Sequence, residues 1–265
     1  MNAMTSTAPP PGGVAAVVCW LMLVAAASSP AVAGECALEP QGEGRVAAII
    51  DARSFRLQDG REVRLAGIEP VAVEKTKQNS ALAAMLTGRE VMLRWEDDTP
   101  DRYGRQPAIV FLDGSETSVQ GLLLSQSEAL VSASVTDRNC ASALIVAEAA
   151  ARDAKRGIWA DPAAIKNAES PGDILSGIGR FGVVEGKVLS VRQAGATTYL
   201  NFGRNWTQGF AVTISRRALS GLEAGGIVIK SLENRRIRVR GWIEARGGPR
   251  IEVLRVGQIE LLGEN

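Results

Sequence analysis

Charged side chains are absent from the first 33 residues of this 265-residue chain, although Asp, Glu, Lys and Arg make up 22% of the whole sequence. Residues 14–27 form a continuous apolar run, which is shorter than the roughly 20 residues of a typical membrane span. Ala31 and Ala33 follow as the small residues expected before a cleavage site. The stretch predicts a signal peptide over residues 1–33 and a secreted or periplasmic protein without stable membrane insertion after cleavage. The alternative is an uncleaved N-terminal anchor.

Cysteine is scarce, with three in the chain, and Cys19 lies inside the apolar run. Removal of the leader leaves Cys36 and Cys140 in a protein that is expected to be exported, and we predict that these two form a disulfide. A bond across a loop of that length stabilises the fold by about 4 to 5 kcal/mol in the loop-entropy description. The alternative is two unpaired thiols.

Net charge is also close to zero, at +1, so overall charge does not point to nucleic acid. The charge is unevenly distributed, however. Residues 34–170 contain 16 Lys and Arg against 21 Asp and Glu, whereas residues 171–265 contain 14 against 8. With 46% hydrophobic residues the chain is long and apolar enough for one or two globular domains, and the C-terminal part is the electropositive one.

Alternating and helical patterns predict one domain over residues 44–161. The period of two in VRLAGIEP, residues 63–70, places Arg64 on the strand face opposite Val63 and Leu65. Further strands are expected at residues 45–51, 54–58, 90–95 and 106–112, and helices at residues 79–88, 119–124 and 138–154. This order is that of a mainly β fold with helices, built on a five-stranded oligonucleotide-binding (OB) barrel.

A Pro- and Gly-containing linker is expected over residues 162–176, followed by a second small, OB-like β-barrel over residues 177–265. Arg236, Arg238 and Arg240 recur at period two, and Trp242 continues the same face. Basic residues interleaved with aromatics bind single-stranded nucleic acid, because cations meet the backbone and bases stack on rings. The alternative is a solvated arginine face above core aromatics.

Three motifs together resemble the thermonuclease, or staphylococcal-nuclease-like, family: RVAAIIDARSFRLQDGREVRLAGIEP, DRYGR at residues 101–105, and EAAARDAKRGIW at residues 148–159. The resemblance covers about Glu43 to Asp161. It implies the OB barrel and a calcium-dependent phosphodiesterase that cuts DNA and RNA. By motif position, Arg64 and Arg105 correspond to the two phosphate-holding arginines of the family.

The acidic half of the implied site is altered. The Asp-Gly-Asp-Thr metal motif of the family is replaced by Asp51, Ala52, Arg53 and Ser54, so an arginine stands at one ligand position. Asp51 and Glu69 remain as metal ligands implied by the resemblance, and Ala72 occupies the place of the general base. A calcium ion takes six to eight oxygen ligands, so metal binding is expected to be weak or absent.

Arg53, Arg64 and Arg105 can still bind phosphate, because guanidinium makes bidentate contacts to phosphate oxygens. We therefore expect a degenerate nuclease that binds single-stranded DNA, RNA or a phosphorylated ligand without a cofactor. A purely structural alternative pairs Arg53 with Asp51 or Glu69.

Two other functions remain open. One is an active Ca²⁺-dependent nuclease in which a shifted Glu74 joins Arg64 and Arg105 in catalysis. The other is an envelope scaffold built from two tandem barrels, with protein partners.

Overall fold

A computed structural model of the chain describes residue 1 and residues 38–263, except residues 72–74, 133, 136 and 206–207. The signal-peptide prediction, Cys36 and Glu74 therefore concern positions outside the described residues. The chain divides into a unit over residues 1–32 and one compact unit over residues 33–265. Every helix and strand of the described residues belongs to the second unit. Among these helices, none is both long and apolar enough to cross a membrane.

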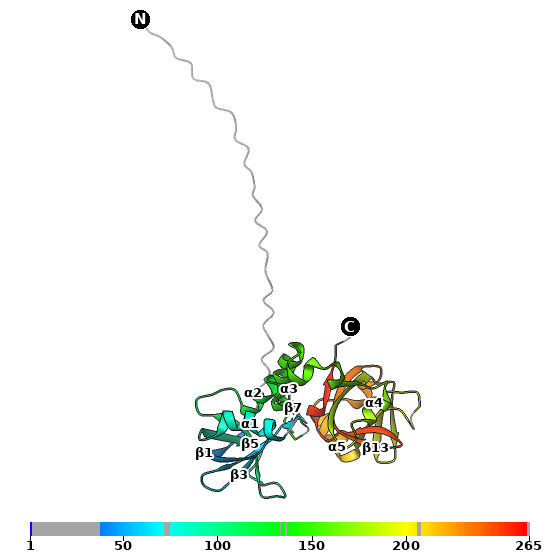
Figure 1. Cartoon of the computed structure of the whole chain (residues 1–265). Helices are drawn as coiled ribbons and strands as arrows, with labels where there is room; N and C mark the ends of the chain where they lie inside the picture. The colour runs from blue at the N-terminus through cyan, green and yellow to red at the C-terminus, as the bar shows by residue number, and fades with distance from the viewer. Residues whose placement is uncertain (2–37, 72–74, 133, 136, 206–207, 264–265) are drawn as a thin grey trace. The chain divides into compact units, whose positions relative to one another are not determined.

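Five strands of the first domain close a barrel in the order β1-β2-β3-β6-β5 (Figure 1). They are β1 (Glu39–Asp51), β2 (Ser54–Leu57), β3 (Glu62–Leu65), β5 (Glu90–Trp95) and β6 (Gln106–Leu112). Val63 and Leu65 on β3 are buried, whereas Arg64 between them is partly exposed, as the period of two predicts. The OB-type barrel expected for this domain is thereby confirmed.

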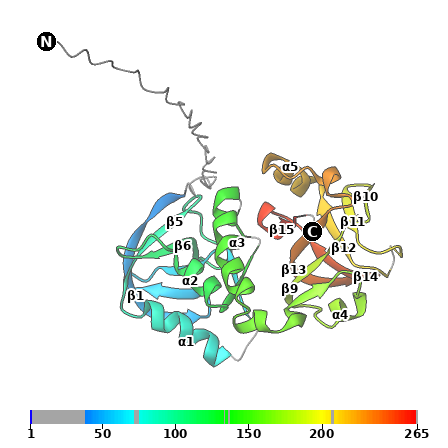
Figure 2. The same cartoon turned by 90° about the horizontal axis from the view of Figure 1, so that it is seen from above.

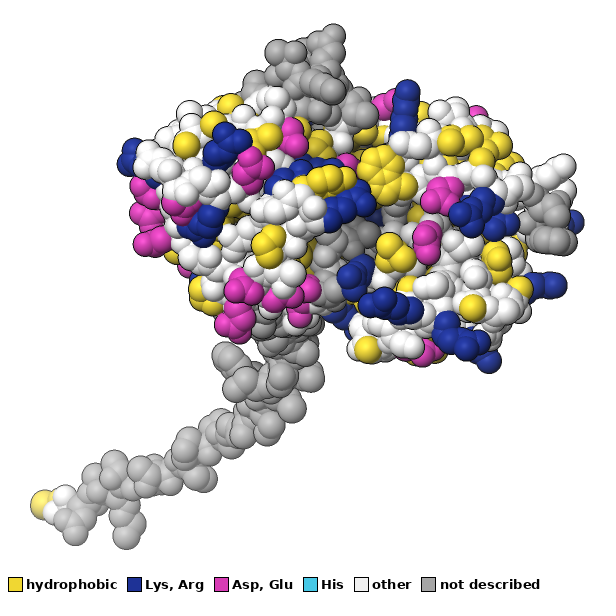
Figure 3. Space-filling view, turned by 90° about the horizontal axis from the view of Figure 1, so that it is seen from below, with side chains coloured by type: hydrophobic (Ala, Val, Ile, Leu, Met, Phe, Trp, Pro, Cys, Tyr) yellow, Lys and Arg dark blue, Asp and Glu magenta, His cyan; other side chains and the backbone are white. Residues whose placement is uncertain are grey.

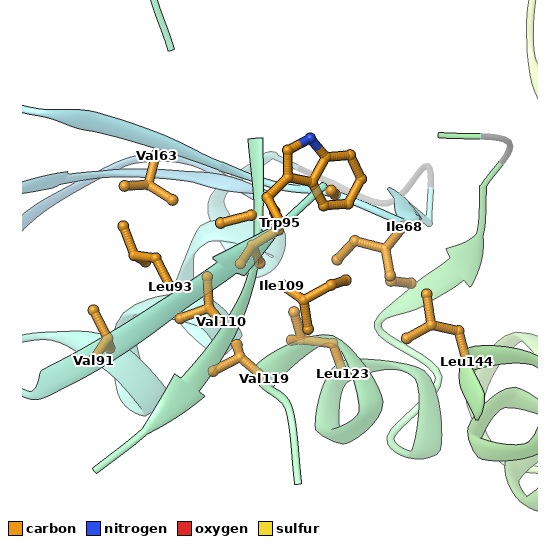
Figure 4. Close-up of a cluster of buried hydrophobic side chains, with 14 of the residues drawn as sticks. Val63, Ile68, Val91, Leu93, Trp95, Ile109, Val110, Val119, Leu123 and Leu144 are labelled. Atoms are coloured by element: carbon orange, nitrogen blue, oxygen red, sulfur yellow. The ribbon is translucent and has the colours of Figure 1, made fainter. Parts of the chain in front are cut away.

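Three helices accompany the barrel (Figure 2): α1 (Lys75–Leu86), α2 (Val119–Ser125) and α3 (Arg138–Asp153). The Ser118 hydroxyl accepts a hydrogen bond from the Gly121 N–H and begins α2, and the Asp137 carboxylate accepts one from the Cys140 N–H and begins α3. Figure 4 shows Val119 and Leu123 of α2 facing the apolar side chains of the strands. These contacts form one buried core that also takes in Leu144 of α3.

A short strand pair carries the residues that follow Arg64. β4 (Ile68–Pro70) pairs with β7 (Ala129–Val131), and Glu69 lies opposite Leu130. Gly67 turns the chain from β3 into β4 with a φ of +80°, a conformation that favours glycine. A Cβ atom at Gly67 would lie 2.4 Å from Cδ1 of Leu144. The step from Arg64 to Glu69 therefore depends on close packing against α3.

The C-terminal domain is one eight-stranded sheet in the order β10-β11-β12-β14-β13-β9-β8, with β15 paired to β13. Its strands are β8 (Ile165–Asn167), β9 (Phe181–Lys187), β10 (Ser190–Ala194), β11 (Thr197–Asn201), β12 (Ala211–Ser215), β13 (Arg236–Arg246), β14 (Gly248–Glu252) and β15 (Ile259–Leu261). Helices α4 (Pro171–Leu175) and α5 (Arg216–Ala224) complete it, with the short 3-10 helices η3 (Ile229–Leu232) and η4 (Val256–Gln258). Two further 3-10 helices, η1 (Gly157–Ala160) and η2 (Pro162–Ala164), precede β8.

This topology corrects two expectations. The described strands of the C-terminal domain pair in one eight-stranded sheet, where a second small, OB-like barrel is predicted. Residues 162–176 are also more than a linker, because Ile165 pairs in parallel with Val183 and extends the sheet as β8. Pro162 and Pro171 begin short helical turns there, which is a favoured position for proline.

Arg238 and Arg240 of β13 belong to a buried ion network, so these two do not form the predicted nucleic-acid-binding face with the exposed Arg236. Arg240 is fully buried, and its Nη1 lies 2.6 Å from Oε2 of Glu148 on α3, which is also fully buried. Arg238 is bonded to Glu185 and Glu260, and the more exposed Arg236 is also bonded to Glu185. The period-two face exists, but the first domain and neighbouring strands cover it at Arg238 and Arg240.

Candidate phosphate-binding site

Arg64 leaves the end of β3 and lines a cavity of about 570 Å³. Arg53, Glu69 and Asp101 line the same cavity, although they come from the β1–β2 turn, β4 and the loop before β6. The barrel brings them together because β3 pairs with β2 on one side and with β6 on the other. On the face shown in Figure 3, Lys and Arg side chains gather beside hydrophobic ones at a hollow.

Arg53 and Glu69 form an ion pair across this site. Nη1 of Arg53 contacts Oε2 of Glu69. The exposed fractions of the two side chains are 22% and 15%. The backbone N–H of Arg53 also donates to Oδ1 of Asp51 at 2.9 Å. The pairing of Arg53 considered from the sequence is therefore present, and both carboxylates that remain from the metal motifs accept hydrogen bonds from this one arginine.

Asp101 holds the second arginine of the site. Its Oδ2 accepts from Nη2 of Arg105 at 2.8 Å and from Nε at 3.0 Å, while Oδ1 accepts from the backbone N–H groups of Tyr103 and Arg105. The Arg105 guanidinium also lies 5.0 Å from the ring centroid of Tyr103. Asp101 thus accepts hydrogen bonds from the backbone and side chain of its own DRYGR loop, and these bonds orient Arg105.

Arg64 is the least engaged of the three guanidiniums. Its Nη1 lies 3.8 Å from Oδ2 of Asp101, which is an ion contact longer than a hydrogen bond. Burial lowers the pKa of Arg64, and the positive charges of Arg53 and Arg105 lower it further. Among the described residues, the Arg64 guanidinium makes this ion contact and donates no hydrogen bond of its own.

Burial and charge shift the two carboxylates of the cavity in opposite directions. Burial raises the pKa of Glu69, although the charge and hydrogen bond of Arg53 oppose the shift. For Asp101 burial acts in the same upward direction, but the hydrogen bonds from Arg105 and Tyr103 prevail and lower the pKa. Asp101 therefore stays ionised over a wider pH range than Glu69 does.

The described residues of this site do not fit a calcium ion. Calcium prefers six to eight oxygen ligands, many of them carboxylate. In the described part of the chain no three His, Cys, Asp or Glu residues group as a metal site. The guanidinium of Arg53 is paired with Glu69, and its positive charge would repel a dication at that carboxylate.

The predicted site residues fall into three groups in the structure. Arg53, Arg64 and Glu69 line the 570 Å³ cavity, and Arg105 joins them through Asp101. Asp51 lines a neighbouring cavity of about 830 Å³, together with Arg53 and Glu69. Arg236, Arg238 and Arg240 belong instead to the ion network of β13. The possible base Glu74 lies outside the described residues.

Two residues at the site were missed as site residues by the sequence reasoning. Asp101 opens the DRYGR motif, and its position four residues before Arg105 is the signal that could have revealed its role. Phe181 lines both cavities and packs edge-on against Trp242, with the ring centroids 6.0 Å apart. No sequence pattern brings Phe181 to Arg53, because the two residues belong to different domains.

A closed OB barrel with clustered arginines at the end of β3 is the arrangement of a nuclease-fold domain. Residues 63–161 match the family model of the staphylococcal nuclease homologues. The first domain of the chain is therefore staphylococcal-nuclease-like, as its motifs indicate. A search of curated proteins gave no match for this chain.

Proposed function

We propose that this protein is an exported, degenerate nuclease that binds single-stranded nucleic acid or a phosphorylated ligand without a metal. Arg64 and Arg105 hold the phosphate, and Arg53 adds a third guanidinium. Cleavage of phosphodiester bonds is weak or lost, because the general-base position is Ala72 and loss of a positioned base costs about 10² to 10⁴-fold in rate.

The ion pair between Arg53 and Glu69 carries this proposal. A metal site would need Glu69 free to coordinate, yet its Oε2 accepts from Arg53, and Asp51 accepts from the Arg53 backbone. The positive charge that a dication would bring is thus supplied by a side chain. Guanidinium can donate two parallel hydrogen bonds to phosphate oxygens. An arginine in place of a metal-ligand carboxylate therefore favours phosphate binding over metal-assisted hydrolysis.

Arg64 is the residue best placed for the first contact with phosphate. It lines the cavity, and its one ion contact in the described residues is the 3.8 Å approach to Asp101. Arg105 is oriented by two hydrogen bonds to the same carboxylate. Asp101 therefore acts as a positioning residue that keeps two cations on one side of the cavity.

The test is binding of a fluorescent single-stranded DNA to the mature chain, measured by anisotropy with calcium and with chelator. We expect equal, salt-sensitive binding in both conditions and an intact oligonucleotide afterwards. Arg64→Ala and Arg105→Ala should weaken binding and reduce the salt slope by about 1. Arg45→Ala is the matched control, because Arg45 pairs with Glu90 on the exposed barrel surface.

Calcium-dependent cleavage that Glu74→Ala abolishes would instead establish an active nuclease. Absence of both binding and cleavage would reject the proposal and favour the scaffold alternative. N-terminal sequencing of the secreted protein tests the export step, with a start near Gly34 expected.

A further inference from the structure

We propose that Trp242 stacks on an unpaired base of the ligand whose phosphate contacts Arg64, so that the site selects single strands over duplex. The inference rests on the proposed function and deepens it. It assigns Trp242 to the phosphate site of the first domain, instead of to a separate binding face with Arg236, Arg238 and Arg240.

The position of Trp242 along β13 is the first observation. Arg240 and Trp242 are two residues apart and share one face of the strand. At Arg240 that face is covered by Glu148 of the first domain. At Trp242 the face is open, and the indole lines the cavity that Arg53 and Arg64 also line. Strand β13 therefore contacts the first domain through Arg240 and, two residues later, places the Trp242 ring in the cavity that Arg53 and Arg64 line.

Exposure separates Trp242 from the other described tryptophans. Its exposed fraction is 51%, whereas Trp95 and Trp159 have 8% and 6%. Phe181 on β9 lies opposite Trp242 in the strand register and meets its ring at 80°. This edge-on contact supports the indole from one side. A large exposed ring that is held in place suits stacking, because it loses little freedom when a flat ligand binds.

Charge is distributed unequally over the two walls of the cavity. The barrel wall carries the guanidiniums of Arg53 and Arg64 and two carboxylates, Glu69 and Asp101, which are paired with Arg53 and Arg105. The C-terminal wall carries the carboxylates of Glu244 and Glu252 with Arg255. A phosphate is favoured at the first wall and opposed by the carboxylates of the second. The group that reaches the C-terminal wall should therefore be uncharged and flat, as a nucleobase is. Carboxylates can also accept from exocyclic amino groups of bases.

The distance between the walls is fixed by buried interactions. Arg240 bonds to Glu148 and Glu260, and the side chain of Gln258, which lines the cavity, donates to the carbonyls of Arg240 and Glu252. The volume of about 570 Å³ lies in the range of small-ligand sites. A base inside a duplex is already paired and stacked, so it cannot offer its face to Trp242 unless it is flipped out.

The experiment compares three probes of equal length with the full mature chain in the presence of chelator. They are a single-stranded DNA, the same phosphodiester backbone without bases, and a duplex. Because base–aromatic stacking strengthens binding by roughly 5- to 150-fold per base, the single strand should bind that much more tightly than the abasic backbone. It should also bind more tightly than the duplex and quench the tryptophan fluorescence.

Variants then locate the effect. Trp242→Ala should lower single-strand affinity to the abasic level and leave abasic binding unchanged, while Trp242→Phe, which keeps an aromatic face, should retain most of the preference. Arg64→Ala should weaken both probes. Equal affinity of the wild type for the single strand and the abasic backbone would overturn the stacking inference and leave the proposed function standing. An equal loss of affinity for these two probes in Trp242→Ala would have the same meaning. Failure of the wild type to bind either probe would reject both proposals.

Discussion

Glu148 and Arg240 form an ion pair in which neither side chain has exposed area, with Oε2 and Nη1 2.6 Å apart. The second carboxylate oxygen of Glu148 accepts from the backbone N–H of Val131 at 2.8 Å. Val131 belongs to β7, whose neighbouring residue Leu130 lies opposite Glu69 on β4. Glu148 therefore links Arg240 of the C-terminal domain to β7, and β7 pairs with β4, the strand that carries Glu69.

Removal of one partner of this pair should destabilise the whole unit. Glu148→Ala leaves the buried Arg240 guanidinium with Glu260 alone, and breaking a buried pair costs about 3 to 5 kcal/mol. Urea unfolding should show that loss, whereas the exposed pair tested by Arg45→Ala should contribute less than about 1 kcal/mol. Equal small losses in both variants would contradict the structural role of the pair.

Substitution Arg53→Asp should create affinity for calcium. The change removes the guanidinium that is paired with Glu69 and adds a third carboxylate to Asp51 and Glu69, which suits a hard cation. We expect calcium to raise the melting temperature of the variant, with no effect on the wild type. Arg53→Ala is the control, because it frees Glu69 without adding a ligand. A calcium response of the wild type equal to that of Arg53→Asp would refute the reading of Arg53 as a substitute for the metal.

Anion binding should strengthen as pH falls through the titration of Glu69. The pKa of Glu69 is raised above 4.5, chiefly by burial, so acidification neutralises it earlier than an exposed glutamate. Its protonation removes a negative charge beside Arg53, while a phosphodiester probe does not titrate in that range. Affinity measured between neutral pH and about pH 5 should therefore rise in the wild type. Glu69→Gln should bind tightly throughout, and persistence of the pH dependence in that variant would exclude Glu69 as its source.

Gly67→Ala should disturb both stability and phosphate binding. The residue has a φ of +80°, and an added Cβ would meet Leu144 at 2.4 Å and Val135 at 2.9 Å. Unfolding should become easier by more than about 1 kcal/mol, with weaker binding because the turn joins Arg64 to Glu69. Gly60→Ala is a useful control, since Gly60 also has positive φ but has open space at its Cβ. Similar losses at both positions would leave only backbone strain as the cause.

The disulfide between Cys36 and Cys140 stays a prediction, because Cys36 lies outside the described residues. Cys140 is 2% exposed at the start of α3. A thiol assay on the denatured mature protein should find no free thiol before reduction and two after it. Two thiols without reduction would disprove the bond.

The barrel could be predicted because its signals are local. Val63 and Leu65 alternate with Arg64, and the helices expected at residues 119–124 and 138–154 are present as α2 and α3. The family motifs then predicted that Arg64 and Arg105 belong to one site, although they lie far apart in the sequence. Local alternation also identified the face of β13 that carries Arg240 and Trp242.

Sequence patterns did not indicate what covers that face. Glu148 stands in an alanine-rich helix, where a lone glutamate is usually solvated, and its partner Arg240 is 92 residues away. The pairing of Ile165 with Val183 was missed for a related reason, because Pro162 and Pro171 indicate a loop. In both cases tertiary contacts, rather than local sequence preferences, determine the structure.

The buried Glu148 also bears on whether the first domain can exist alone. The family match ends at residue 161, but the carboxylate of Glu148 and the guanidinium of Arg152 are satisfied by Arg240 and Glu260 of the C-terminal domain. A fragment ended at residue 161 would expose these groups and the apolar surface around them. The nuclease-like domain of this protein therefore shares its buried charges with the C-terminal domain, whose strand β13 also brings Trp242 to the cavity that Arg53 and Arg64 line.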